Sequence, residues 1–239
     1  MAKYLQPTAP IAEAAVLPGD PKRAMELATE LFERPLMSNL QRGLWGYWGE
    51  LDGGVGLTVQ STGIGGPSAV AVLHELAGHG VRRAIRVGTC LTLDQSLSLG
   101  DVVVVSEALA GDGASRALDA PPTVALDGAL TAALAARTGA RAARIVTTDV
   151  PHDASAAAAQ NRGAGALAVD GCATPLAALA SRLGISFACA LVVAEDDSDG
   201  LPREELDRAL LEVGQAAAAA LAEAQPASES GSSSAPAAR

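Results

Sequence analysis

The segment from Ala84 to Cys90 constrains the fold more than any other stretch of the chain. One charged residue, Arg86, interrupts an apolar and β-branched run, and Gly88 then allows the backbone to turn before Thr89. A short run of this kind is typical of a strand buried on both faces, as in the sheets of α/β proteins. Such a strand would deliver a cation and a hydroxyl group to a site at its carboxyl end.

Arg86 has two interpretations. Burying a guanidinium group is costly unless it meets an anion. The anion could be a carboxylate of the protein core, or it could be a ligand. We favour the ligand because other features suited to anion binding precede this strand.

The first of these features is the junction at Gly19. An apolar strand over 14–17 runs into Pro-Gly-Asp-Pro, where Asp20 is a good N-cap and Pro21 a good first helical residue. Gly19 then lies where a strand meets a helix N-terminus, with Arg23 one turn further on. Free backbone N–H groups and the helix dipole make this geometry suitable for phosphate. The helix is expected to place Met25, Ala28, Leu31 and Phe32 on one face.

The rest of the chain alternates between strand and helix patterns. Strands are predicted at 42–48, 55–60, 84–90, 101–106, 142–148, 164–169 and 186–194. Helices are predicted after the Gly-rich segment 61–68 and at 125–138, 175–183 and 203–224, with a loop at 112–115. This alternation predicts one three-layer α/β/α domain with a central mixed β-sheet at 14–224, preceded by an extended arm (1–13) and followed by a disordered tail (225–239).

Composition argues against several classes of protein. A formal net charge of −10 argues against a nucleic-acid partner. No apolar run of about 18 residues is present to span a membrane, and the N-terminus lacks a signal-peptide pattern. Cys90, Cys172 and Cys189 lie in apolar surroundings without metal-ligand spacing. We therefore expect reduced core cysteines, no metal site and a cytoplasmic location.

The order and spacing of four segments resemble the nucleoside phosphorylase family, and its uridine phosphorylase branch in particular. These segments are 17–23, 61–68, 86–89 and 112–115. The likeness runs from about residue 14 to 115, and more loosely to about 222. The resemblance implies that this protein cleaves a nucleoside with phosphate, giving the free base and a pentose 1-phosphate.

The resemblance implies specific roles for residues of this chain. Gly19, Arg23, Arg86 and Thr89 would bind phosphate, with Arg86 and Thr89 as the candidate catalytic groups. Arg42 would be supplied to the site of a neighbouring subunit, which implies a homodimer or a hexamer built from three dimers. Inorganic phosphate is the expected co-substrate, a nucleoside-like molecule the expected partner, and no cofactor is expected.

The chain departs from the family where the sugar would bind. Asp170, Gly171 and Cys172 stand where the family has Glu-Met-Glu, whose second Glu grips both ribose hydroxyls. A neutral thiol cannot accept two hydroxyl hydrogen bonds as a carboxylate does. Asp170 could take over that role if the strand end shifts. Pro175 predicts a later helix start, with Thr174 as its cap.

Further departures concern the base. Pro151 lies near the position of the family's stacking aromatic residue, and Leu91, next to Cys90, replaces a glycine beside the base. Glu195 or Asp196 aligns near the acid that purine-specific relatives use to protonate the leaving base. A solvated acidic loop is the alternative for that segment.

Three interpretations of function follow. The first is a nucleoside phosphorylase with an altered sugar and base site. The second is a catalytically lapsed relative that binds phosphate or a phosphosugar as a sensor or structural partner. The third is a nucleosidase that uses water, which ranks last because the phosphate arginines Arg23, Arg42 and Arg86 are all retained.

Overall fold

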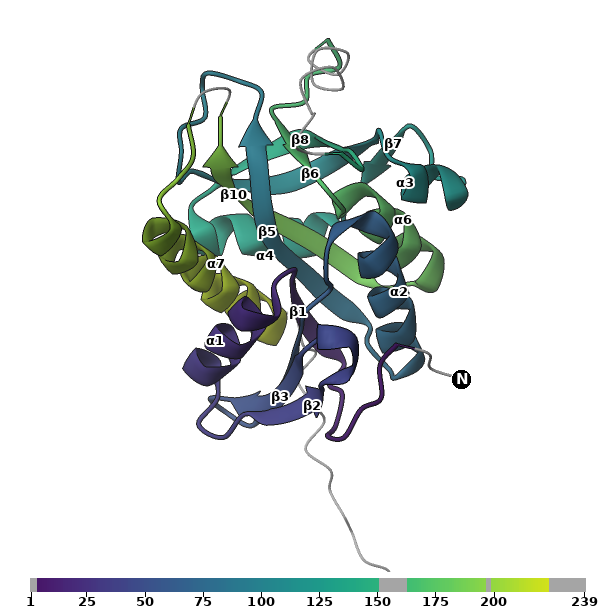
Figure 1. The fold of residues 1–239 in the computed structure, drawn as a ribbon, viewed down its shortest axis with the longest axis vertical. Helices are drawn as coiled ribbons and strands as arrows, with labels where there is room; N and C mark the ends of the chain where they lie inside the picture. The colour runs from purple at the N-terminus through teal and green to yellow at the C-terminus, as the bar shows by residue number, and fades with distance from the viewer. Residues whose placement is uncertain (1–3, 151–162, 197–198, 224–239) are drawn as a thin grey trace, which may run out of the picture.

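A computed structural model describes residues 4–150, 163–196 and 199–223. Its strands are β1 (Ala14–Pro18), β2 (Leu36–Asn39), β3 (Gly46–Leu51), β4 (Val55–Gln60), β5 (Arg83–Thr92), β6 (Val102–Ala110), β7 (Thr123–Ala125), β8 (Arg141–Thr147), β9 (Ala168–Asp170) and β10 (Ser186–Glu195). Its helices are α1 (Pro21–Leu31), α2 (Gly65–Gly78), α3 (Gly113–Ala117), α4 (Gly128–Thr138), α6 (Ala173–Leu183) and α7 (Arg203–Glu223), with a 3-10 helix η1 at Gln41–Gly43. Figure 1 shows their arrangement.

These strands form one mixed sheet, with β5 at its centre. β5 runs parallel to β1 and to β10 and antiparallel to the short β9. Because β10 pairs with both β5 and β6, the strands β5, β9, β8, β6 and β10 close into a ring, and β1, β4, β3 and β2 extend the sheet from β5. The predicted mixed sheet is confirmed, whereas this closure was not predicted.

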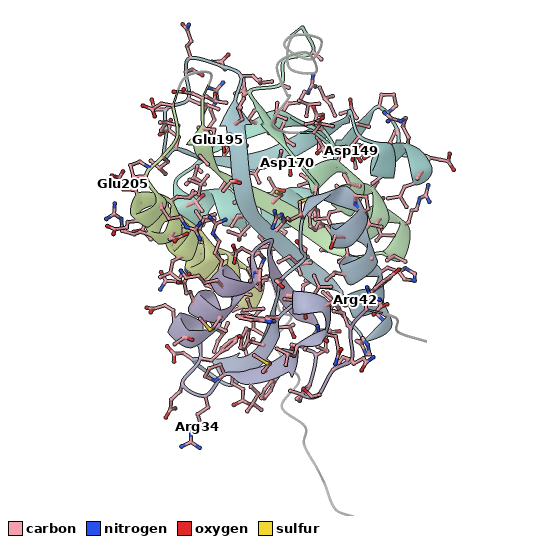
Figure 2. All side chains as sticks on the ribbon, viewed as in Figure 1. Arg34, Arg42, Asp149, Asp170, Glu195 and Glu205 are labelled. Carbon is pink, nitrogen blue, oxygen red and sulfur yellow. The ribbon has the colours of Figure 1, made fainter. Side chains whose placement is uncertain are left out.

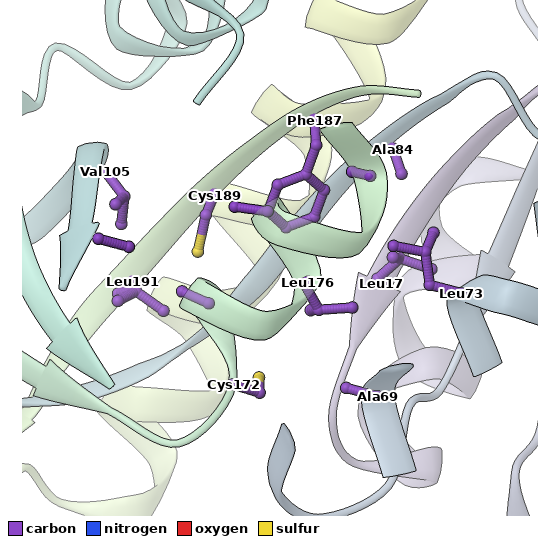
Figure 3. Packing of buried hydrophobic residues seen from close by; sticks show 14 of the residues in the cluster. Leu17, Ala69, Leu73, Ala84, Val105, Cys172, Leu176, Phe187, Cys189 and Leu191 are labelled. Carbon is purple, nitrogen blue, oxygen red and sulfur yellow. The ribbon is translucent and has the colours of Figure 1, made fainter. Parts of the chain in front are cut away.

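Helices cover both faces of the sheet, and each face has its own apolar core. α2 and α6 pack over a core that contains Leu17, Leu73, Leu176 and Leu191 (Figure 3). α1, α4 and α7 pack over the other core, which is built mainly from Ala, Leu and Val. Two helix layers around one sheet are the expected α/β/α arrangement.

The N-terminal segment packs against the domain. Leu5 is 0% exposed and joins the core beneath α2. The Glu75 carboxylate accepts hydrogen bonds from the backbone N–H groups of Tyr4 and Leu5, at 2.7 Å for Leu5. The expected extended arm is thus part of the packed structure over residues 4–8.

Some predicted elements differ from the structure. Residues 42–43 belong to η1 and not to a strand, because Arg42 and Gly43 both adopt positive φ. Residues 112–115 begin α3, since the Asp112 side chain accepts the Ser115 N–H and caps a helix there. The strand expected at 164–169 is confined to 168–170, where β8 and β5 pair with it. Met25 is 40% exposed, so it does not belong to the buried face of α1.

α6 begins at Ala173, two residues earlier than predicted. The carboxylate of Asp170 accepts the N–H groups of Cys172 and Ala173, which would otherwise lack partners at the helix N-terminus. Pro175 fits inside the first turn, where a missing N–H costs little. Thr174 is not the cap, because its hydroxyl bonds to the Leu109 carbonyl.

None of the described helices combines the length and apolar character needed to cross a membrane. The tail predicted to be disordered (225–239) lies outside the described residues, which end with α7 at Glu223.

Leu5→Ala should lower the free energy of unfolding by about 2–5 kcal/mol, as expected for a leucine removed from a packed core. Chemical denaturation measures this change. Gln6→Ala is the matched control, since the Gln6 side chain is exposed. Equal stability of the two variants would show that the N-terminal segment does not contribute to the core.

Candidate functional site

A cavity of about 760 Å³ opens at the carboxyl ends of β1 and β5. It is lined by residues of the β1–α1 junction, η1, the loop before α2, β5, β9 and the end of β10. The predicted site residues that border it are Gly19, Arg23, Arg42, Arg86, Thr89, Cys90, Leu91, Asp170, Gly171, Cys172 and Glu195. Pro151 lies outside the described residues. The tertiary structure thus brings together residues that are up to 176 positions apart, from Gly19 to Glu195.

Arg86 lies at the inner end of this cavity. Its Nη1 donates hydrogen bonds to the carbonyl oxygens of Leu17 at 3.0 Å and Val87 at 2.9 Å. Two nearby glycines leave room for the guanidinium group. A Cβ on Gly88 would lie 2.8 Å from Nη2, and a Cβ on Gly19 would lie 3.3 Å from Nη1. Carbonyl groups of β1 and β5 and the absence of two side chains therefore fix the direction of this cation.

Asp170 supplies a negative charge near Arg86. One carboxylate oxygen accepts the Thr147 hydroxyl at 2.6 Å, and the other accepts the N–H groups of Cys172 and Ala173. Burial raises the pKa of Asp170, while these hydrogen bonds and the Arg86 charge act in the opposite direction. Arg86 therefore lies near a carboxylate of the core, as one interpretation of its burial requires. It also borders the cavity, so it is placed where a ligand could reach it.

Cys172 occupies the wall beside Arg86. The pKa of its thiol is raised to about 11 by burial, so the group is neutral at pH 7. The charges of the nearby Arg86 and Asp170 act on this pKa in opposite directions, Arg86 lowering it and Asp170 raising it. Three of the four acceptor positions of the Asp170 carboxylate already hold protein donors, and Cys172 has no carboxylate, so this wall lacks acceptors for both hydroxyls of a sugar diol.

The start of α1 contributes a second cation. Asp20 caps this helix by accepting the N–H groups of Lys22 and Arg23. The Arg23 side chain borders the cavity, and its Nε lies 3.4 Å from a carboxylate oxygen of Asp207 on α7. Asp207 also pairs with Arg203 at 2.8 Å, so it shares its charge between two arginines.

Arg42 reaches the cavity from η1. Its backbone is in the left-handed region, with φ 58° and ψ 19°, and Gly43 follows with φ 70°. The guanidinium carbon lies 5.1 Å from the centre of the Tyr4 ring, which is a cation–π geometry. Arg42 is therefore held against the N-terminal segment at the edge of the site.

The loop before α2 completes this end of the cavity, although it was not among the predicted site residues. Gly63, Ile64, Gly65 and Ser68 line the cavity, and both glycines have positive φ. α2 has no side-chain cap, so backbone N–H groups remain at its first turn. The signal that could have identified this loop was the Gly-rich spacing in front of an apolar helix.

Cys90, Leu91 and Glu195 line another part of the cavity. Cys90 is buried, Leu91 of β5 pairs with Val169 of β9, and Glu195 is exposed at the end of β10. Figure 2 shows Arg42, Asp170 and Glu195 projecting from three different elements. Asp196 is not among the residues that line the cavity.

The segment 112–115 lies away from this cavity. Asp112 is buried near Gly66 of α2, where an added Cβ would lie 3.6 Å from its Oδ1. This motif therefore connects α3 to α2 and does not contribute to the cavity. In the part of the chain that the structure describes, no cluster of His, Cys, Asp or Glu could hold a metal ion.

Replacing Arg42 separates backbone strain from charge. Arg42→Ala and Arg42→Gly both remove the guanidinium group, but glycine adopts positive φ without steric cost. We expect Arg42→Gly to be more stable than Arg42→Ala by about 1 kcal/mol, measured by chemical denaturation. At Arg34, which has no positive φ, the glycine variant should instead be the less stable of the pair, because glycine loses more chain entropy on folding.

The cysteines should resist thiol reagents in the folded protein. A thiol with a pKa of about 11, as at Cys172, is ionised to only about one part in a thousand at pH 8, against roughly a quarter for an ordinary cysteine. Burial also raises the pKa of Cys90 and Cys189. Reaction with a chromogenic disulfide should be at least about a hundredfold slower than in denaturant, where all three cysteines react. Rapid modification of the native protein would contradict this description.

Comparison with known proteins agrees with the geometry. The family described as the Phosphorylase superfamily matches residues 13–225. A "Purine nucleoside phosphorylase DeoD-type" of Bacillus cereus is 32% identical over 194 residues, which is 77% of this chain and 82% of the relative. A "Uridine phosphorylase" of Salmonella typhimurium is 40% identical over 104 residues, which is 44% of this chain and 40% of the relative. This chain belongs to the Phosphorylase superfamily.

Proposed function

We propose that this protein cleaves the glycosidic bond of a nucleoside with inorganic phosphate, giving a free base and a pentose 1-phosphate. The observation that supports this most directly is the convergence of Arg23, Arg42 and Arg86 on one cavity with Thr89 and Gly19. Three cations in a protein of net charge −10 form a local site for an anion. Phosphate is the co-substrate used by the family.

The arrangement suits a positioned nucleophile. A phosphate held by these groups would direct one oxygen at the anomeric carbon, where a C–O bond forms as the C–N bond to the base breaks. The bonding electron pair leaves with the base, while positive charge develops on the sugar beside the bound phosphate. The fixed donors lower the barrier by holding and orienting the phosphate, and the negative charge of that phosphate stabilises the positive charge on the sugar. Arg86 is the main candidate because its direction is set by the Leu17 and Val87 carbonyls.

The comparisons support a nucleoside substrate without selecting its base. The purine-type relative aligns over more of this chain, while the uridine-type relative is more similar over a shorter segment. We propose Glu195, which borders the cavity, as the group that interacts with the base. Asp196 is a weaker candidate, because its carboxylate accepts the Asp199 N–H at 2.7 Å. In this proposal Arg42 serves the cavity of its own chain, which it borders. Donation of Arg42 to a neighbouring subunit, which the resemblance implies, is the alternative arrangement.

A second function is supported by the wall at Cys172. The neutral thiol and the engaged carboxylate of Asp170 leave that wall without a free acceptor for two sugar hydroxyls. The alternative is a protein that binds phosphate or a phosphosugar without cleaving nucleosides. Both functions use the same three arginines, so the two are distinguished by turnover and not by phosphate binding.

The direct test is base release from a panel of purine and pyrimidine nucleosides, including 2′-deoxyribonucleosides, with and without phosphate. We expect release that depends on phosphate and yields a pentose 1-phosphate. Equal release without phosphate would indicate hydrolysis by water. No release across the panel, together with intact phosphate binding, would favour the alternative function.

Arg86→Ala should abolish stabilisation of the protein by phosphate. A ligand that binds only the folded state raises its stability by RT ln(1 + [L]/Kd), which is about 2.7 kcal/mol at a hundredfold excess over Kd. Thermal unfolding with and without phosphate measures the difference for each variant. Thr89→Val, which keeps the shape of the side chain, should weaken phosphate binding by roughly tenfold.

Arg144→Ala is the matched control for this measurement, because Arg144 pairs with Glu107 outside the cavity. It should keep the full response to phosphate. Undiminished protection of the Arg86→Ala protein would exclude Arg86 from the phosphate site.

A further inference from the structure

We propose that Asn39 and Gln60 are positioning residues, which hold the turn at Arg42 and so determine how tightly its guanidinium binds an anion. The inference rests on the proposed function in one respect, since it takes phosphate as that anion. Neither Asn39 nor Gln60 lines the cavity, and both act through the backbone that carries Arg42.

The two amides meet at one carbonyl group. Asn39 Nδ2 donates to the Leu44 carbonyl oxygen at 2.5 Å, and Gln60 Nε2 donates to the same oxygen at 2.9 Å. Asn39 is 1% exposed and Gln60 is 0% exposed, so water does not compete for these bonds. Leu44 is the second residue after Arg42, and its own N–H bonds to the Gln41 carbonyl at 3.0 Å. The turn is thus fixed at its C-terminal end by both backbone polar groups of one residue, Leu44.

This turn requires such a restraint. Arg42 and Gly43 adopt left-handed conformations in succession, with φ 58° and φ 70°. For a residue with a Cβ this conformation is sterically strained, so it persists only where the surrounding structure enforces it. Arg42 also has few other restraints, because the contact described for its side chain is the Tyr4 ring.

The Gln60 side chain can point only one way. Besides Leu44, its Nε2 faces the carbonyl oxygens of Ser61 at 3.0 Å and Trp45 at 3.4 Å, so a flipped amide would place oxygen against oxygen. Its Oε1 is buried and has no hydrogen-bond partner among the described residues. Gly46 provides the necessary space, since a Cβ there would lie 2.1 Å from Oε1. A buried unpaired acceptor is costly, and the donor end of the amide offsets that cost by holding the turn.

The same hydrogen bonds connect Arg42 with the rest of the cavity. At the end of β4, the Ser61 N–H bonds to the Trp45 carbonyl at 2.9 Å, and the Gly63 N–H bonds to the Gly19 carbonyl at 3.0 Å. Gln60 therefore sits between the Arg42 turn and the loop that meets the β1–α1 junction. On the other side, Asn39 Oδ1 accepts the N–H of Gln6 at 2.9 Å, close to Tyr4.

The test is a double-mutant cycle with inorganic phosphate as the probe and the full chain in its own assembly. Gln60→Met keeps the length of the side chain but removes the donor. We expect it to raise the Kd for phosphate by about tenfold, because a strained turn that has lost its restraint adopts the binding-competent conformation less often. In an Arg42→Ala background the same substitution should leave the Kd unchanged. The KM for phosphate should rise in parallel, while the KM for the nucleoside stays constant.

A second measurement does not depend on phosphate. Hydrogen exchange of the Leu44 amide should be faster in the Gln60→Met protein, because the turn opens more often. Asn39→Ala is the second variant if Gln60→Met does not fold, and it should give the same pattern. Leu134→Ala is the control for general loss of stability, since Leu134 is buried in α4 away from this turn.

Each outcome is decisive. Equal effects of Gln60→Met with and without Arg42, or unchanged exchange at Leu44, would overturn this inference while leaving the proposed function intact. A wild-type protein that phosphate does not protect would overturn the proposed function and this inference together.

Discussion

The environment of the Arg86 guanidinium is the constraint on which the site depends. A cation inside an apolar sheet needs negative charge and hydrogen-bond acceptors. The structure supplies the Leu17 carbonyl of β1, the Val87 carbonyl of β5 and the buried carboxylate of Asp170. Although burial lowers the pKa of Arg86, the neighbouring Cys172, Cys189 and Asp170 more than offset this and raise it. The guanidinium is therefore a permanent cation with a fixed direction.

Asp170 links this cation to the architecture of the second half of the chain. The same carboxylate that faces Arg86 caps α6 and accepts the hydroxyl of Thr147 at the end of β8. One side chain therefore stabilises a helix N-terminus and balances a charge at the cavity. This double use explains why Asp170 is not free to replace the acid that the family uses for a sugar diol. The wall at Cys172 remains the part of the site that departs most from the family.

The opposite end of the cavity depends on backbone geometry more than on charge. Arg42 and Gly43 adopt positive φ, and the buried amides of Asn39 and Gln60 hold the carbonyl that ends their turn. Hydrogen bonds between β4, the loop before α2 and the β1–α1 junction then join these pieces into one unit. Preorganisation of this kind places charged side chains without requiring a large rearrangement when an anion binds.

Local patterns in the sequence determined the fold class, the β1–α1 junction and the strand that carries Arg86 to the cavity. Asp20, Pro21 and Gly19 act through neighbouring backbone, so their roles can be inferred from adjacent residues. Tertiary structure alone decided the closure of the sheet, the left-handed turn at Arg42 and the start of α6. Each of these depends on a partner distant in sequence: β10 pairs with β5, Gln60 bonds to Leu44, and the Asp170 carboxylate that caps α6 accepts the hydroxyl of Thr147 on β8. Such contacts leave no periodic signal in a single sequence, because they arise only after the chain has folded.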